Sequence, residues 1–307
     1  MGGGPYFPHE QELGHLLTPE LFSCLVQARM PYPKHGSINF SHFGRDIFLE
    51  DPVGTQVRDK VLPALVALSK IGLEHMPDLM AAYLPPPTDD SFPEQCLGLL
   101  LLLDHFPRLL LRGMDARWTY GYFDVISQHV ARIWISLPAD QRPDSWERWQ
   151  AGVGLDYWIG VRFWFGTPFV HSEQLQAIAV KFTDETRRRV EQVTGKKDPY
   201  REKRDDVLSD IYGFPREYRK GPPQGDDVTR ESWTFWMGML MDIHKPIIDS
   251  FGRYPYLNAV LGRQSSDEEK AYVEKTGHFG EVGPDVAKRI LEDIKNGRWT
   301  RLGDEQA

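Results

Sequence analysis

Apolar positions recur along most of this 307-residue chain at intervals of three and four residues, the spacing that places them on one face of a helix. Between residues 52 and 71, for example, Val57, Val61, Leu65 and Leu68 share such a face. Every long periodic segment repeats near 3.6 residues, and none has the two-residue alternation of a half-buried strand. The pattern predicts an all-α protein, a multi-helix array or bundle that forms a single compact unit.

Residues typical of helix ends locate the expected helices. Thr18, which precedes a proline, and Ser172 are expected N-caps, and Pro138 ends a long helix that begins near Arg117. The helices expected on this basis cover residues 20–28, 117–137, 174–193, 233–250 and 284–296.

The chain is expected to have three regions. An N-terminal helical region covers 1–88, a helical core covers 89–275, and a C-terminal helix with its tail covers 276–307. Within the core, residues 195–228 are rich in Gly, Pro and charged side chains, a composition that predicts a long, mobile surface loop.

The segment from Cys96 to Gly113 places two charged residues inside a run of leucines. Burying Asp104 and Arg108 without partners would cost more free energy than a single domain has to spare, so both must be hydrogen-bonded. Pro107 lacks a backbone donor and predicts a break between two short helices. The polar pair is therefore either a buried structural lock or part of a site.

Aromatic side chains gather in two segments. Trp158 and Trp164 belong to the first, over residues 145–165, while Trp233 and Trp236 open the helix expected over 233–250. Such clusters are typical of a protein core, yet they also supply flat apolar walls for a hydrophobic ligand.

Two histidines lie near these clusters. His171, in the sequence FVHSE, is expected to project from a loop, and His244 ends the apolar stripe of the helix that begins at Trp233. A histidine in that second position is more often a hydrogen-bonded core residue than a ligand.

Charge and cysteine content exclude several classes of protein. Lys and Arg total 36 against 44 Asp and Glu, a formal net charge of −8, so a nucleic-acid or anionic-membrane surface is not expected. Cys24 and Cys96 lie among apolar neighbours, which indicates neither a disulfide framework nor a thiol metal site and favours a cytoplasmic location. The N-terminus lacks a secretion signal, and no apolar run is long enough to span a bilayer.

Motifs for well-known chemistries are missing from the sequence. It has no GxSxG elbow, no Walker loop and no dinucleotide loop. Asp205, Asp206 and Asp210 resemble half of the metal-binding set of a prenyl-diphosphate cyclase, but no second half follows. His171 and His244 lack paired zinc-ligand spacing, so we expect no metal and no cofactor.

Three blocks together resemble the domain of unknown function 924 family. They are LLLLLDHFPR with the following Arg-Gly, FVHSE, and His244 followed by SFGRYPYLNAVLGR and an acidic helix start, and they span roughly residues 90 to 275. The resemblance implies a fold similar to tetratricopeptide-like helical arrays. It also implies that one interior polar pocket collects Asp104, Arg108, Arg112, His171, Glu173, His244, Arg253, Asn258 and Arg263.

The sequence departs from the family pattern in the same blocks. His105, Leu109, Tyr256 and Leu257 stand where the family favours Gln, Asn, His and Arg. These changes leave a pocket with fewer polar anchors, which favours a larger and more hydrophobic small molecule; neutral repacking of a structural network is the alternative.

These observations lead to one functional hypothesis. We expect a cofactor-independent enzyme of secondary metabolism that acts on a hydrophobic small molecule by cyclisation, isomerisation, a lyase reaction or a pericyclic step of the Diels-Alder type. It would act by shape and by hydrogen bonds to a carbonyl or carboxylate. The expected catalytic residues are His171, His244, Glu173 and Tyr256. The expected substrate-binding residues are Asp104, His105, Arg108, Trp158, Trp164, Trp233, Trp236, Arg253, Asn258 and Arg263.

Two alternatives stay open at this point. The chain could be a non-catalytic helical binding or scaffold module, which an open groove with fully paired polar residues would indicate. It could also be a metal-dependent prenyl-diphosphate cyclase. The oligomeric state is open, and the cavity itself is expected to be bordered by His171, Glu173, His244, Arg253 and Tyr256.

Overall fold

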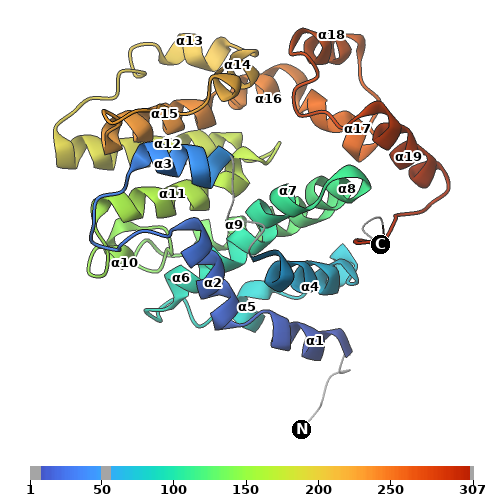
Figure 1. The fold of residues 1–307 in the computed structure, drawn as a ribbon, viewed down its shortest axis with the longest axis horizontal. Coiled ribbons are helices and arrows are strands. Elements are labelled where there is room, and N and C mark those ends of the chain that lie inside the picture. The colour runs from blue at the N-terminus through green and yellow to red at the C-terminus, as the bar shows by residue number, and fades with distance from the viewer. Residues whose placement is uncertain (1–7, 50–56, 305–307) are drawn as a thin grey trace.

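The computed structural model describes residues 8–49 and 57–304. Within these ranges every regular element is a helix, which confirms the predicted all-α class (Figure 1). No helix in the described ranges is both long and apolar enough to cross a membrane. The likeness to tetratricopeptide arrays and the cytoplasmic location stay predictions.

Helix α11 (Leu155–Val170) forms the centre of the fold. All of its residues are buried, because apolar side chains surround it on every side instead of forming one stripe. It packs against α6 (Phe92–Leu100), α9 (Asp124–Ile135), α12 (Gln176–Thr194) and α15 (Arg230–Asp242). In Figure 1, α12 and α15 lie on one side of α11 and α6 lies on the other.

Helix α2 (Pro19–Arg29) completes the layer beyond α6, and the contact between these two helices depends on a glycine. A Cβ atom added at Gly98 would lie 2.4 Å from Cβ and 2.6 Å from Cα of Phe22. The backbones can therefore approach this closely only because position 98 has no side chain.

The other helices have three to twelve residues each. In the N-terminal part they are α1 (Pro8–Leu16), α3 (Phe40–His42), α4 (Arg58–Ser69), α5 (Leu79–Tyr83), α7 (Phe106–Leu110), α8 (Ala116–Trp118) and α10 (Trp146–Trp149). In the C-terminal part they are α13 (Arg204–Ser209), α14 (Gly213–Lys220), α16 (Lys245–Phe251), α17 (Asn258–Leu261), α18 (Asp267–Lys275) and α19 (Pro284–Lys295).

The predicted break in the leucine-rich segment at Pro107 is absent, so this prediction is wrong. Helix α6 passes through a π-helical turn, Leu101–His105, directly into α7. Pro107 is the second residue of α7 and directly follows the π-helical turn, so the chain stays helical through the proline. A second π-helical turn, Thr119–Phe123, separates α8 from α9 inside the helix predicted over 117–137.

Other boundaries confirm or correct the predictions. Thr18 caps α2 as expected, with its side chain accepting the Leu21 N–H. Ser172 does not cap α12, which begins four residues later; its Oγ accepts the Gln174 N–H at 3.2 Å instead. The polar segment 195–228 is not an open loop, since it contains α13 and α14, and its mobility stays a prediction.

The buried side chains form two hydrophobic clusters. The larger one surrounds α11, and the smaller one includes Tyr254, Tyr272 and Ile290 from the C-terminal helices. The elements α16 to α19 that carry the smaller cluster form an arc beside the rest of the molecule (Figure 1). A large cavity lies at the junction between the two clusters.

Candidate functional site

A cavity of about 460 Å³ lies between the two hydrophobic clusters. Pockets that hold drug-sized molecules span about 300–1,000 Å³, so this space accommodates a small organic ligand. Its lining consists of His105, Arg108, Leu109, Arg112, Tyr120, Phe163, Trp164, Thr167, Val170, His171, Phe214, Tyr218, Met237, Leu240, Met241, His244, Tyr254, Tyr256, Leu257, Phe279 and Gly280.

Helical spacing explains how each wall is built. Met237, Leu240, Met241 and His244 recur every three or four residues along α15 and just beyond it, so they face the cavity together. The C-terminal half of α11 supplies the next wall and ends at His171.

Arg108 joins two buried carboxylates at the edge of the cavity. Its Nη1 donates to the backbone O of Asp104 at 2.6 Å and lies 3.4 Å from Oδ1 of the same residue. Its Nη2 donates to Oδ2 of Asp124 at 2.8 Å. The predicted pairing of Asp104 and Arg108 is thus confirmed, as is the burial of Asp104, whereas Arg108 is only partly buried and Asp124 is an additional partner.

The two carboxylates have different electrostatic environments. Burial opposes ionisation of Asp104, but the charges of His171 and Arg108 outweigh it and hold its pKa below the ordinary range. Burial dominates at Asp124 and raises its pKa despite the charge of Arg108. The pKa of Asp104 is therefore shifted down and that of Asp124 up, although both carboxylates contact Arg108.

His171, on the cavity wall, pairs with Asp104 behind it. The imidazole Nδ1 lies 3.0 Å from Oδ1 and 3.1 Å from Oδ2 of Asp104. Because an ionised carboxylate can only accept, Nδ1 carries the proton, and Nε2 is left on the opposite side of the ring. This is the arrangement in which a carboxylate orients an imidazole for proton transfer.

His244 lies on the same cavity but has a different character. Its Nδ1 donates to the backbone oxygens of Leu240 at 3.0 Å and Met241 at 3.2 Å, and the ring of Phe214 covers it at 3.7 Å between centroids. Burial, followed by the charge of His171, lowers the pKa of His244 to about 3. It is a neutral hydrogen-bond acceptor at Nε2 rather than an acid.

Aromatic rings complete the walls. Tyr256 stacks on Tyr254 with centroids 5.2 Å apart, and burial raises the pKa of both phenols, which keeps them protonated. His105 packs against Trp164 at 4.5 Å, and burial together with the charge of Arg29 lowers its pKa, so it is a neutral wall residue.

Besides Asp104, which lies behind Arg108 and His171, four other polar residues of the predicted site lie outside the lining. Arg263 binds Glu173 with two hydrogen bonds of 2.9 Å, and Glu173 also accepts the backbone N–H of Tyr254. Arg253 binds Glu269 at 2.6 and 2.8 Å, and Asn258 donates to the same carboxylate. The expectation that Glu173 and Arg253 border the cavity is wrong, because their charges are already paired.

These ion pairs have a structural consequence. They fix the segment around Tyr254 against the end of α11, where the Tyr254 hydroxyl donates to the Val170 carbonyl at 2.5 Å and accepts from Gln176. Glu173 and Arg263 therefore position one wall of the cavity from outside it.

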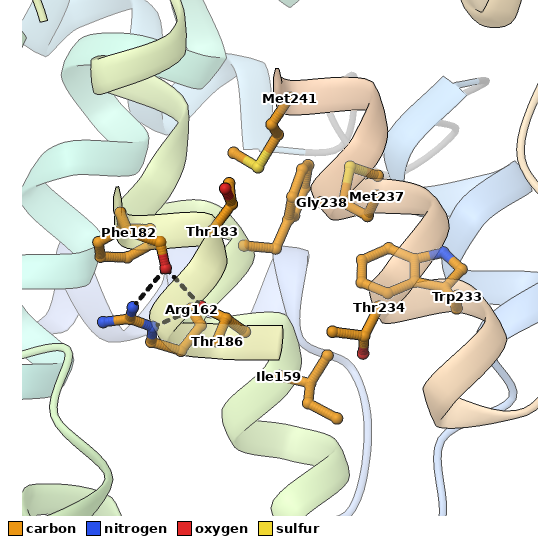
Figure 2. Close-up of a pocket in the computed structure, with 11 residues that line it drawn as sticks. Ile159, Arg162, Phe182, Thr183, Thr186, Trp233, Thr234, Met237, Gly238 and Met241 are labelled. Carbon is orange, nitrogen blue, oxygen red and sulfur yellow. Dashed lines mark hydrogen bonds between the residues drawn. The ribbon is translucent and has the colours of Figure 1, made fainter. Parts of the chain in front are cut away.

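Three of the four predicted tryptophans are also elsewhere. Trp158 donates to the backbone of Asp144, Trp236 is buried outside the lining, and only Trp164 faces the cavity. Trp233 borders a separate space of about 20 Å³ between α11, α12 and α15, enough for one water molecule. Figure 2 shows that Arg162 points at the Phe182 carbonyl and Thr186 beside this space.

Sequence reasoning missed several lining residues. Phe214 and Tyr218 belong to α14 within the supposed loop, and Phe279 packs on both with centroids 5.2 and 5.4 Å away. The signal available was the apolar pair four residues apart, at 214 and 218, which is typical of a helix face. Asp124 carried no such signal, because one carboxylate near a helix start is ordinary.

The described ranges contain no group of three or more His, Cys, Asp or Glu side chains arranged to hold a metal ion. Of the three aspartates considered for a prenyl-diphosphate cyclase, Asp205 and Asp206 are exposed on α13, and Asp210 binds Arg216 at 2.7 Å. This arrangement does not support that alternative.

Comparison with known proteins adds a family. The model of a family described as "Bacterial protein of unknown function (DUF924)" matches residues 73–277. This range includes the cavity lining except for Phe279 and Gly280. No curated protein and no solved structure matches the chain.

Proposed function

The chain belongs to the DUF924 family, and from this premise we propose that it is an enzyme that rearranges an apolar small molecule by proton transfer at His171. The observation that carries the proposal is the Asp104–His171 pair, whose imidazole lies on the wall of a cavity of about 460 Å³ lined mainly by aromatic and aliphatic side chains. Isomerisation, cyclisation and elimination are the reactions that such a pair can drive.

His171 acts as the base in this mechanism. Its Nε2 takes a proton from a carbon next to a substrate carbonyl, while ionised Asp104 holds Nδ1–H and stabilises the imidazolium that forms. The imidazolium then returns the proton to a different atom, which gives an isomer, or to a leaving group, which gives an elimination product. No other reactant is consumed.

Tyr256 has the properties needed to stabilise the intermediate. Its phenol is kept protonated by burial and lies on the same cavity, so it donates to the oxyanion that develops at the carbonyl. The aromatic walls hold the apolar part of the substrate and exclude water, which strengthens this hydrogen bond.

The pairing of the polar groups supports an enzyme over a scaffold module. Glu173, Arg253 and Arg263, outside the cavity lining, already have oppositely charged partners. His171 and His244, by contrast, line the cavity, and the hydrogen bond at Nδ1 leaves the Nε2 of each ring to act on a ligand. A scaffold has no use for a carboxylate-oriented imidazole inside an apolar cavity.

The test uses purified protein with a panel of apolar carbonyl compounds in D₂O, with products and deuterium uptake followed by mass spectrometry. We expect His171→Gln to lower turnover by about 10²-fold or more, while His129→Gln, at an exposed site outside the cavity, has no effect. Turnover should also survive a metal chelator. Deuterium uptake that persists in His171→Gln would overturn the proposal.

A cavity-filling variant separates proton transfer from catalysis by shape alone. Leu109 is a partly buried lining residue, so a larger ring at this position extends into the cavity. If Leu109→Trp loses turnover while His171→Gln keeps it in full, proton transfer at His171 is refuted, and the cavity catalyses ring closure by its shape alone.

A further inference from the structure

We propose that Arg112 binds an anionic end group at the cavity mouth, so that the substrates are apolar molecules carrying one negative charge, such as hydrophobic carboxylates or acidic enols. This inference rests on the proposed function, because it names the substrate class of the same cavity. It concerns binding only and involves no covalent step.

The first argument is the balance of charge around the cavity. Of the lining side chains that carry or can take a positive charge, Arg108 is paired with Asp104 and Asp124, and His171 is paired with Asp104. Arg112 differs, since the hydrogen bond that the structure gives its side chain runs from Nη1 to the backbone O of Arg108 at 2.6 Å.

The second argument is the composition of the lining. None of the described residues that line the cavity is an aspartate or a glutamate. An anionic ligand therefore meets no carboxylate on the surface it touches. A cationic ligand would be separated from the carboxylates of Asp104 and Asp124 by Arg108 and His171, which pair with them. The cavity selects against cations and is compatible with an anion.

The third argument is the position of the guanidinium. Arg112 is exposed although it borders the cavity, which places its side chain at the mouth. Burial raises the pKa of Tyr120 and Tyr218, and the charge of Arg112 acts against that rise at both phenols. Guanidinium and phenol donors thus share one region of the mouth.

This position also avoids the main cost of binding an anion. A carboxylate taken into the apolar interior would lose its hydration, a penalty of several kcal/mol. At the mouth it stays partly hydrated while the planar guanidinium offers two parallel donors. The apolar body of the molecule then occupies the space between Trp164 and Phe214.

The experiment compares two fluorescent probes that share one apolar body. 1-Anilinonaphthalene-8-sulfonate is an anion, and N-phenyl-1-naphthylamine is the same molecule without the sulfonate. We expect Arg112→Gln to raise the Kd of the sulfonate probe about threefold to fivefold and to leave the Kd of the neutral probe unchanged. Arg112→Lys should fall between, because it keeps the charge and loses the planar pair of donors.

Two control variants locate the effect. Arg188→Gln removes the same charge from a side chain that is 65% exposed, pairs with Asp184 and lies outside the lining, so neither Kd should change. Leu109→Trp should weaken both probes, which shows that they occupy the cavity.

The outcomes distinguish this inference from the proposed function. If Arg112→Gln weakens both probes equally, Arg112 only caps the end of α7 and the anion site is refuted, while the proposed enzyme is untouched. If Arg188→Gln has the same selective effect as Arg112→Gln, the sulfonate binds by general surface charge and the inference is also refuted. If Leu109→Trp weakens neither probe, the cavity does not take apolar ligands, and both proposals fall.

Discussion

Replacing Asp104 by Asn tests how the buried charges hold the site together. The substitution keeps the volume of a side chain that is 1% exposed, so it creates no cavity and removes only the negative charge. Arg108 then retains Asp124 as its one carboxylate, and His171 loses the acceptor that fixes its ring. We expect a large loss of stability and, if His171 is the base, of turnover.

The size of the effect follows from the geometry. Removing one partner from a buried ion pair costs about 3–5 kcal/mol, and the lower end applies because Asp124 still pairs with Arg108. For a chain of 307 residues the unfolding entropy is roughly 0.6 kcal/mol/K, so a loss of about 3 kcal/mol lowers the Tm by about 5 °C. Urea unfolding at constant m-value gives the free energy directly.

The pH dependence adds a second measurement. Because the pKa of Asp104 is lowered in the folded state, its stabilisation is present above the unfolded pKa of about 4 and is lost as pH falls through the folded value. The stability difference between wild type and Asp104→Asn should therefore narrow only below about pH 4.

A matched control decides the case. Asp267→Asn removes the same charge from a side chain that is 93% exposed, and it should change stability by less than about 0.5 kcal/mol. An Asp104→Asn protein that melts with the control would show that the carboxylate is solvated, and it would refute both the lock and the oriented imidazole.

Three further predictions concern other parts of the fold. The pKa of His244 is lowered to about 3, so below about pH 6.5 the unfolded chain binds a proton at His244 that the folded protein does not bind. The free energy of unfolding of the wild type, measured in urea, should therefore fall by roughly 2–3 kcal/mol between pH 7 and pH 4.5. His244→Gln should not show this fall. Gly98→Ala should cost about 1–3 kcal/mol by overpacking, whereas Gly152→Ala, with its nearest contact at 3.9 Å, should be tolerated. Arg263→Gln should lower the Tm by leaving Glu173 unpaired without changing the preference between the two probes.

Much of the fold follows from the spacing of apolar residues. The charged pair inside the leucine run had to be buried and bonded; both residues are hydrogen-bonded, Asp104 is buried and Arg108 is partly buried. The residues typical of helix ends predicted the first and last residues of α2 and α19 to within about one residue. Local sequence rules suffice where a helix end or a buried charge has one physical solution.

Other features depend on contacts between distant segments. Pro107 disfavours a continuous helix, yet the chain stays helical through it by way of the π-helical turn Leu101–His105, which the local sequence does not predict. Glu173 and Arg253 have the chemistry of site residues, yet Arg263 and Glu269 neutralise them. Glu173 and its partner are 90 residues apart and Arg253 and its partner are 16 apart, so neither pairing leaves a local sequence pattern.

Two of the π-helical turns, Leu101–His105 and Thr119–Phe123, explain why stability and chemistry meet at one place. Such turns are rare because their hydrogen bonds are less favourable, and they persist where tertiary contacts compensate. Asp104 lies within the turn Leu101–His105, Asp124 directly follows the turn Thr119–Phe123, and Arg108 bridges them. The same bridge fixes the carboxylate that orients His171. Turnover lost in Asp104→Asn therefore cannot by itself be assigned to weakened structure or to lost catalysis. His171→Gln leaves the bridge intact, so the turnover that it loses reports on the chemistry.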